Sequence, residues 1–139
     1  MKLDDVMDGI ARRIKDLGGL QVHAQPPKTI IPPAAVVSYP ETIEYDATYG
    51  RGMDRISGLS VWLVVGKVTD RSARDALAAY AADTGAKSVK LALEDDSDED
   101  RPWDDLHVAS AEFDILTIAG IDYIAAGFTL NLACQGGTS

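Results

Sequence analysis

The sequence predicts a single α+β domain in which a mainly antiparallel sheet carries two or three helices on one face. Three observations lead to this fold class. An amphipathic helical pattern opens the chain, a second helical stretch lies at residues 71–84, and two long β-rich runs close the chain around a tight turn at residues 119–120. No strand–helix–strand repeat requires parallel strands. The 139 residues suit one domain, covering residues 1–139.

The first element is an amphipathic helix, predicted over residues 3–17. Asp4 and Asp5 near its start, and three basic residues near its end, suit the helix dipole. Gly18 and Gly19 supply a C-terminal stop. The apolar positions recur at helical spacing and therefore share one side of the helix: Leu3, Val6, Met7, Ile10, Ile14 and Leu17.

The next segment predicts extended structure interrupted by prolines. A short extended piece at residues 20–24 leads into a Pro-rich connector at residues 25–33, where the proline density forbids a helix. Residues 34–46 favour β-structure, with Pro40 marking a bend or an edge position because it has no N–H to donate. Residues 55–66 become apolar toward their end and predict a central strand.

Two helical segments are predicted in the second half of the chain. Asp70 is a suitable N-cap for a helix over residues 71–84, and Gly85 closes it. Residues 88–93 are compatible with a short helix, which we favour, or with a strand, because their apolar residues also alternate. The longer helix is expected to bury Ala73, Leu77 and either Tyr80 or Ala81.

An acidic run at residues 94–101 (EDDSDEDR) has no apolar anchor and predicts a solvated loop. Its alternating aspartates are spaced like the first ligands of a calcium loop. Such a loop needs glycine at its sixth position and an acidic residue at its twelfth, where this chain has Arg101 and His107. We therefore expect no metal here. The two β-rich runs that follow, residues 103–118 and 121–134, predict a hairpin.

The chain is acidic, with 22 Asp and Glu against 13 Lys and Arg and a formal charge of −9. This balance disfavours wrapping of nucleic acid, because affinity for phosphates comes from cations. An acidic channel wall, in contrast, repels phosphates and lets a duplex slide past. Three aspartates among the first eight residues do not fit a secretory signal, and no run approaches the ~18 apolar residues of a membrane span.

No residue pattern specifies catalysis, a cofactor or a metal. His23 and His107 are isolated, and Cys134 is the only cysteine, so neither a zinc site nor an intrachain disulfide is expected. A Ser-His-Asp triad can assemble from distant residues, yet no serine lies in a nucleophile-elbow glycine pattern. The Gly-Arg-Gly sequence at residues 50–52 lacks the Lys-Ser/Thr ending of a phosphate-binding loop.

The loop between residues 45 and 55 is the candidate interface of the chain. It concentrates residue types that are enriched at protein contacts. Glycines at two positions can bend its backbone, and aspartates can offer charge partners. The alternative is that Tyr45 and Met53 fold back onto the core. The candidate interface residues are Tyr45, Tyr49, Arg51, Met53 and Arg55.

Four segments together resemble the tail terminator proteins of long-tailed bacteriophages, particularly those infecting actinobacteria. They span residues 3 to about 132. None is a catalytic signature. The head-tail joining and tail tube proteins of the same phages are also small α+β domains. The segments are LDDVMDGIARRI, PPAAVVSYPETIEYDATYGRGMDR, VWLVVGKVTDRSARDALAAYA and AEFDILTIAGIDYIAAGFTLNL.

The resemblance implies a structural protein of the virion tail or neck, assembled in the host cytoplasm. Such a chain forms a ring, expected to be a hexamer, on the last ring of the tail tube. The ring halts tube growth and presents a surface to head-tail connector proteins, while genomic DNA passes through its lumen as cargo and no membrane is involved. The alternatives are a connector or stopper protein of the neck and, in a different class, a small-molecule-binding or enzymatic α+β domain.

Overall fold

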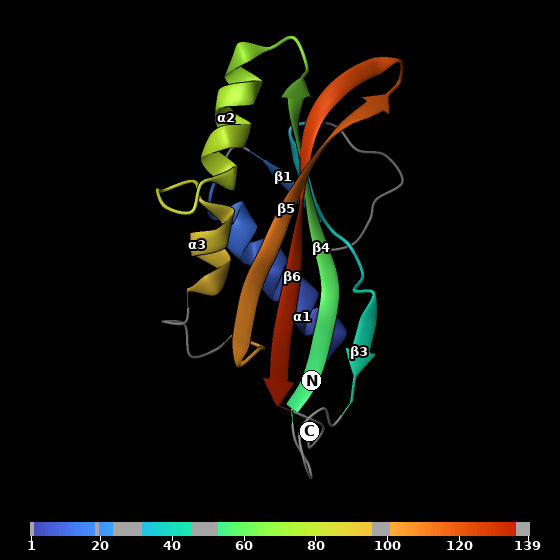
Figure 1. Cartoon of the computed structure of the whole chain (residues 1–139), viewed down its shortest axis with the longest axis vertical. Helices are drawn as coiled ribbons and strands as arrows, with labels where there is room; N and C mark the ends of the chain where they lie inside the picture. Colours follow the sequence, from blue (N-terminus) through green and yellow to red (C-terminus); the bar gives the residue numbers. More distant parts are fainter. Residues whose placement is uncertain (1, 19, 24–31, 46–52, 96–100, 136–139) are drawn as a thin grey trace.

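The computed structural model describes residues 2–18, 20–23, 32–45, 53–95 and 101–135. Within these ranges the chain forms, as predicted, one α+β domain with a six-stranded, mostly antiparallel sheet and three helices (Figure 1). The elements in chain order are α1 (Leu3–Lys15), β1 (Gln21–His23), β2 (Ala34–Val37), β3 (Thr42–Glu44), β4 (Met53–Lys67), α2 (Arg71–Ala81), α3 (Val89–Glu94), β5 (Asp105–Ile118) and β6 (Ile121–Gln135).

The strand order of the sheet is β1-β2-β4-β6-β5, and β3 pairs with the first part of β4. Among the pairings of the described strands, only β1 with β2 is parallel. As a result β5 forms one edge of the sheet along its whole length. The opposite edge is formed by β1 at one end and by β3 at the other.

The helices pack on one face of the sheet, and α1 crosses behind the strands in Figure 1. Alternation along the strands directs every second side chain toward the helices. On β4 these are Ile56, Leu59, Val61, Leu63 and Val65, which are buried in one cluster with the apolar sides of all three helices. This cluster is the core of the domain.

The predicted helices are present, with earlier ends for the first two. α1 ends at Lys15 instead of residue 17, and α2 ends at Ala81 instead of residue 84. Asp70 is the predicted N-cap, since its Oδ1 accepts a hydrogen bond from the backbone N–H of Ser72 at 2.9 Å. α2 buries Ala73, Leu77 and Tyr80, as expected.

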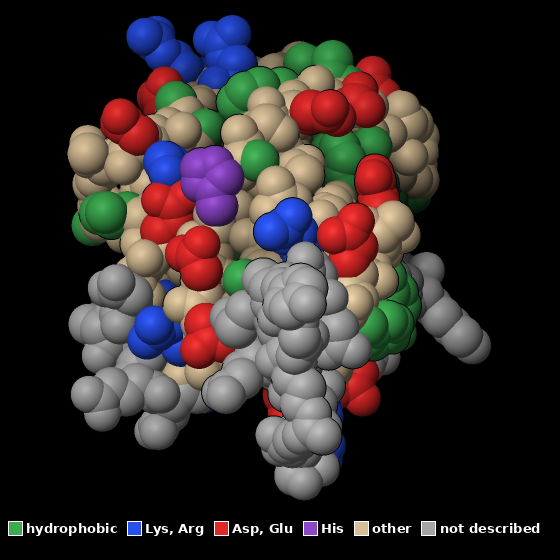
Figure 2. Space-filling model, turned by 60° about the horizontal axis from the view of Figure 1, so that its bottom comes forward, with side chains coloured by type: hydrophobic (Ala, Val, Ile, Leu, Met, Phe, Trp, Pro, Cys, Tyr) green, Lys and Arg blue, Asp and Glu red, His purple; other side chains and the backbone are tan. Residues whose placement is uncertain are grey.

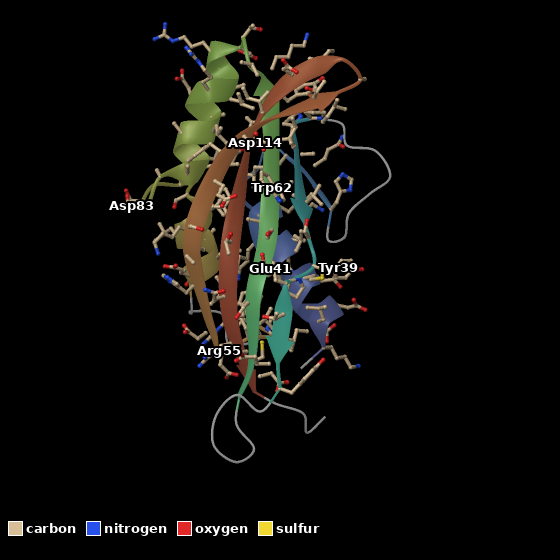
Figure 3. The ribbon with its side chains drawn as sticks, turned by 45° about the vertical axis from the view of Figure 1, so that its right-hand side comes forward. Tyr39, Glu41, Arg55, Trp62, Asp83 and Asp114 are labelled. Carbon is tan, nitrogen blue, oxygen red and sulfur yellow. The ribbon has the colours of Figure 1, made fainter. Side chains whose placement is uncertain are left out.

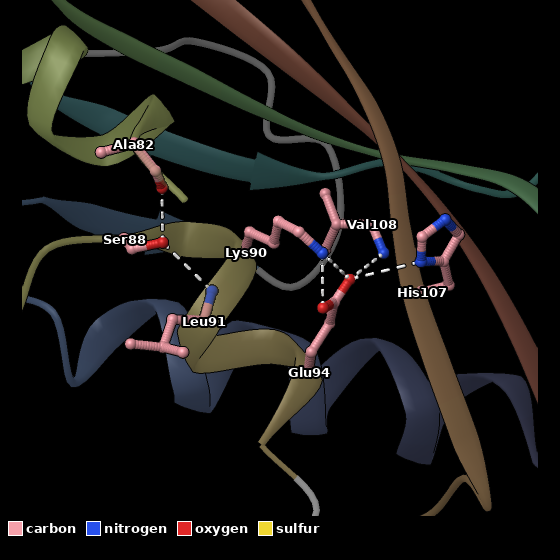
Figure 4. Close-up of polar contacts among 7 residues, drawn as sticks. All are labelled: Ala82, Ser88, Lys90, Leu91, Glu94, His107 and Val108. Atoms are coloured by element: carbon pink, nitrogen blue, oxygen red, sulfur yellow. Dashed lines mark hydrogen bonds and ion pairs between the residues drawn. The ribbon is translucent and has the colours of Figure 1, made fainter. Parts of the chain in front are cut away.

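Residues 88–93 form a helix and not a strand. The Ser88 hydroxyl accepts from the backbone N–H of Leu91 at 3.1 Å and donates to the carbonyl of Ala82 at 2.6 Å (Figure 4). This N-cap fixes the start of α3 against the end of α2. Val89 and Leu93 are then buried in the core, while Leu91 is exposed.

The bend predicted at Pro40 separates β2 from β3, and both strands pair with β4. Gly58 lies in the bulge of β4 opposite this bend, with φ at +74°. A Cβ on Gly58 would come within 2.8 Å of the Glu41 side chain. Glycine therefore allows the backbone conformation and the close approach that the bend requires.

The predicted hairpin is formed by β5 and β6. Ala119 and Gly120 connect them with φ angles of 52° and 79°, the pattern of a two-residue turn whose central residues both have positive φ. The pairing register shifts once, between Val108 and Ser110. Beyond this shift β5 continues as a free edge to the turn.

Candidate assembly surfaces

Exposed large apolar side chains gather in two places on the described part of the chain. The β3 surface consists of Tyr39 and Tyr45, which flank β3 and are 55% and 72% exposed. The hairpin surface consists of Phe113 and Ile115 on β5, which are 62% and 55% exposed, while Ile121, 39% exposed, lies on the opposite face of the hairpin by register. Leu91 on α3 stands apart from both. Contiguous exposed apolar surface on a folded domain commonly marks a contact site.

The two surfaces lie on opposite edges of the sheet and near opposite ends of it. Glu44 at the end of β3 pairs with Arg55, whereas Ile115 pairs with Ile124, which in turn pairs with Gly66. The separation is about ten residues along β4, or roughly 30 Å. Figure 3 places Arg55 near one end of this sheet and Asp114 near the other. A neighbouring molecule can therefore occupy one surface without blocking the other.

A shallow groove adjoins the β3 surface. Its volume is about 390 Å³ and it is open to solvent. The aromatic rings of the β3 surface stand at this groove, next to the first turn of α1. The lining residues are Leu3, Tyr39, Pro40, Glu41, Thr42, Ile43 and Tyr45.

The predicted interface loop is only partly described. Tyr45 is exposed and does not fold back onto the core. Tyr49 and Arg51 lie outside the described residues. Met53 and Arg55 belong to β4, so the loop is shorter than predicted; the side chain of Met53 is not described, and that of Arg55 is exposed.

The hairpin surface and Tyr39 were not among the predicted site residues. Alternation in β5 indicates which side chains share a face, but it does not indicate that the strand lies at an edge. Phe113 and Ile115 face the helix side of the sheet, because they pair with Ala126 and Ile124 of the helix-facing row. No helix covers them. Their exposure depends on how the helices pack across the sheet, which is tertiary information.

The hairpin carries exposed carboxylates, whereas the start of α2 carries both signs of charge, with Arg71 and Arg74 beside the exposed Asp70 and Asp75. Exposed carboxylates Glu112 and Asp114 flank Phe113 on β5, and Asp122 follows the turn. Arg71 and Arg74 are exposed on the first turns of α2, and neither forms an ion pair with another described residue. Both Figures 1 and 3 draw the start of α2 and the hairpin turn on opposite sides of the upper end.

The helix-free face of the sheet carries more acidic than basic groups. By register, Glu44, Asp105, Glu112 and Asp114 lie on it with exposed side chains, against the cations Arg55 and Lys67. In Figure 2, which brings the lower end forward, acidic side chains are spread over the surface and basic ones are fewer.

Glu94 corrects the prediction that residues 94–101 form a solvated loop. It is the last residue of α3, and its carboxylate accepts hydrogen bonds from Lys90 Nζ at 2.6 Å and from the backbone N–H of Val108 at 2.9 Å (Figure 4). His107 Nδ1 lies 3.4 Å away. Burial raises the pKa of Glu94, but these hydrogen bonds and the neighbouring charges outweigh burial, and the pKa lies below its usual 4.5. Residues 96–100 lie outside the described ranges.

Arg13 on α1 also holds the C-terminal end of α3 in place. Its guanidinium donates to the carbonyls of Ala92 at 3.0 Å, Leu93 at 3.4 Å and Asp95 at 2.5 Å, which caps the C-terminal end of α3. The same guanidinium lies 5.0 Å from the ring centroid of Trp103. These contacts stabilise the fold by joining α1, α3 and the start of the hairpin.

Among the described residues, no three or more His, Cys, Asp and Glu side chains are grouped to hold a metal ion. The same residues contain no helix long and apolar enough to cross a membrane. His107 lies on β5 beside Glu94, whereas His23 ends β1. Comparison with protein-family models found no matching family, and comparison with curated protein sequences found no match.

Proposed function

We propose that this chain is a structural protein of a long-tailed phage, a tail terminator that forms a ring and caps the tail tube. The observation that carries the proposal is the presence of two separate exposed apolar surfaces on opposite edges of one sheet. A closed ring is a head-to-tail assembly, so each subunit needs different patches for its neighbours. A ring that also binds a tube needs a further patch, at one end.

The β3 surface suits contact with the tube. Tyr39 and Tyr45 expose aromatic area beside an open groove, and Arg55 lies on the neighbouring strand. Tyrosine and arginine contribute disproportionately to binding energy at protein interfaces. The candidate interface residues Tyr49 and Arg51 follow Tyr45 closely in sequence, so they belong to the same proposed contact.

The charge of the helix-free face suits a wall along which DNA passes. More carboxylates than cations lie on this face, and the whole chain carries a formal charge of −9. Such a surface repels phosphates at close range and gives a duplex no site at which to bind tightly. In the proposed ring this face lines the lumen.

Electron microscopy of the purified chain, alone and mixed with tail tubes of the phage that encodes it, tests the function. Rings seated on tube ends, with tube growth halted, are the expected result. Rings bound only to portal complexes would make the chain a connector of the neck. A monomer that binds neither tubes nor portals would overturn the structural role and favour a small-molecule-binding domain.

A further inference from the structure

We infer that the open edge of β5, between Ala111 and Thr117, binds an extended segment of a partner protein that adds to the sheet as a further strand and carries alternating apolar and basic side chains. This contact goes beyond the proposed function, which names no partner for this edge. Within the described part of the chain, only β6 pairs with β5, so no strand lies along the outer side of β5 (Figure 1). An open edge of this kind binds extended segments through its backbone, and its side chains determine which segment fits.

The backbone groups that face outward from β5 follow from the register of the hairpin. In a hairpin with a two-residue turn, the pair that closes the turn, here Ile118 with Ile121, exchanges backbone hydrogen bonds, and every second pair along the strands does the same. The residues between these pairs direct their N–H and C=O groups away from β6. The hydrogen bond of Ile115 agrees with this direction, because its N–H donates to Oδ1 of Asp114 at 2.7 Å. The outward-facing residues of the open stretch are Ala111, Phe113, Ile115 and Thr117.

The edge of β5 is covered nearer the start of the strand, where α3 lies beside it. The N–H of Val108 donates to Oε2 of Glu94 at 2.9 Å, so this donor is already used (Figure 4). The register of the hairpin then shifts between Val108 and Ser110. The open stretch from Ala111 to Thr117 spans roughly 20 Å, which is the length of an ordinary strand. An added strand therefore pairs with this stretch and not with the start of β5.

The two faces of the open stretch carry different side chains. Phe113 and Ile115 are exposed on the helix side, whereas Glu112 and Asp114 are exposed on the helix-free side. Neither carboxylate forms an ion pair with a described residue. The side chains of an added strand alternate between the same two faces, and neighbouring strands are close enough for their side chains to interact. A strand with apolar residues on one face and basic residues on the other therefore complements both faces of the edge at once.

Charge favours a partner other than a second copy of this chain. β5 carries three carboxylates and neither Lys nor Arg, so two β5 edges bring carboxylates together. The strands of the opposite edge, β1 (Gln-Val-His) and β3 (Thr-Ile-Glu), also have no Lys or Arg. None of the edge strands in the described chain thus supplies the basic groups that the carboxylates favour. Charged residues at an open edge commonly prevent pairing between copies, and here they also select the charge of the partner.

A synthetic peptide tests the edge. Its sequence, Lys-Val-Lys-Ile-Lys-Val-Lys with blocked ends, alternates basic and β-branched residues over the length of the open stretch. In an NMR titration of the isotope-labelled chain, the peptide is expected to bind with a Kd of about 1 mM or lower and to shift the amide signals of residues 110–118. It is also expected to slow hydrogen exchange of the Phe113 and Ile115 amides at least about tenfold.

Two control peptides separate strand pairing from attraction between charges. N-methylation of the backbone amides removes the donors that pair with β5 and keeps every side chain and every charge. Replacement of each Lys by Glu keeps the donors and reverses the charge. Both peptides should bind at least about tenfold more weakly. Equal binding of the N-methylated peptide would overturn the inference, as would signal changes centred on another surface or no binding up to about 5 mM.

Variants of the chain test the two faces separately. Glu112→Gln with Asp114→Asn removes the charges of one face, and Phe113→Ser with Ile115→Ser removes the apolar groups of the other, and each pair should weaken binding of the peptide at least about tenfold. All four side chains are exposed, so circular dichroism should find both variants folded. Asp75→Asn with Asp83→Asn is the control for charge, since both residues are exposed and outside the hairpin, and its binding should stay within about threefold of wild type. Unchanged binding in either hairpin variant would overturn the inference and leave the tube-capping proposal to its own test.

Discussion

Trp62 on β4 lies directly across from Gly127 on β6, and a Cβ on Gly127 would come within 2.6 Å of the indole ring. The absence of a side chain at Gly127 therefore lets the indole cross the neighbouring strand on the helix-free face. Gly127→Ala should lower the free energy of unfolding by about 1–3 kcal/mol, because overpacking a close contact forces neighbouring atoms to move. Urea unfolding monitored by circular dichroism measures the change.

The Trp62→Leu background separates this steric cause from a general effect of alanine in a strand. With the indole removed, Gly127→Ala should lower the free energy of unfolding much less than it does in the wild-type chain. An equal cost in both backgrounds would mean that Trp62 is not the group that the new methyl contacts.

Arg13 should stabilise the fold through its three carbonyl hydrogen bonds and its contact with Trp103. Arg13→Met keeps much of the apolar stem but removes the charge and its donors, and it should lower the free energy of unfolding by about 1–2 kcal/mol. Arg12→Met is the matched control, since Arg12 is exposed on the same helix, and its effect should stay within about 0.5 kcal/mol. Equal effects from both substitutions would remove the special role of Arg13.

Glu94 gives the stability of the chain a component that depends on pH. Its pKa in the folded state is lowered from 4.5, so its contribution is fully present above pH 4.5 and is lost as the pH falls through the folded value. Glu94→Gln should cost about 1 kcal/mol near pH 7, a figure kept small because the side chain is partly exposed. Urea unfolding should show that the difference in free energy of unfolding between the wild-type chain and the Glu94→Gln variant becomes smaller below pH 4.5. A difference that does not change with pH would contradict the stabilising role of the ionised Glu94 carboxylate.

The Cys134 thiol should be almost unreactive in the folded chain. It is 1% exposed, and burial, together with the nearby charges of Asp104 and Asp54, raises its pKa to about 11. Only the thiolate attacks a disulfide reagent, so a colorimetric thiol assay at pH 8 should proceed slowly and accelerate sharply in denaturing urea. Rapid reaction without urea would mean that the end of β6 opens readily.

Much of the fold could be predicted because its signals are local. The helical spacing from Val6 to Ile14, the Asp70 cap and the Ala119-Gly120 turn each identify an element from a few neighbouring residues. The role of Glu94 could not be read in this way, since its partner Val108 is 14 residues away. A run of acidic residues predicts a solvated segment. The hydrogen bond from Val108 nevertheless fixes the Glu94 carboxylate against β5.

The candidate site was less predictable, because exposure is set by what covers a residue. Tyr45 was predicted as an interface residue and is exposed, as that reading requires. Phe113 and Ile115 belong to an apolar pattern that is typical of core strands, and the edge position of β5 leaves them exposed. Composition and periodicity carry no information about that arrangement.

The proposed tube contact predicts that Tyr39→Ser combined with Tyr45→Ser leaves the chain folded but reduces capping. Both side chains are exposed, so their removal should change the free energy of unfolding by no more than about 0.5 kcal/mol. Loss of even one central interface residue commonly costs about 2 kcal/mol of binding energy or more, so tubes should grow longer and more variable in length.

The double variant Tyr49→Ala and Arg51→Ala should likewise give longer and more variable tubes. Leu91→Ser on α3 is the control, because Leu91 is 52% exposed and outside both surfaces, and it should leave tube length unchanged. Tubes of normal, uniform length from a folded Tyr39 and Tyr45 variant would exclude the β3 surface from tube binding and leave the hairpin as the remaining apolar contact.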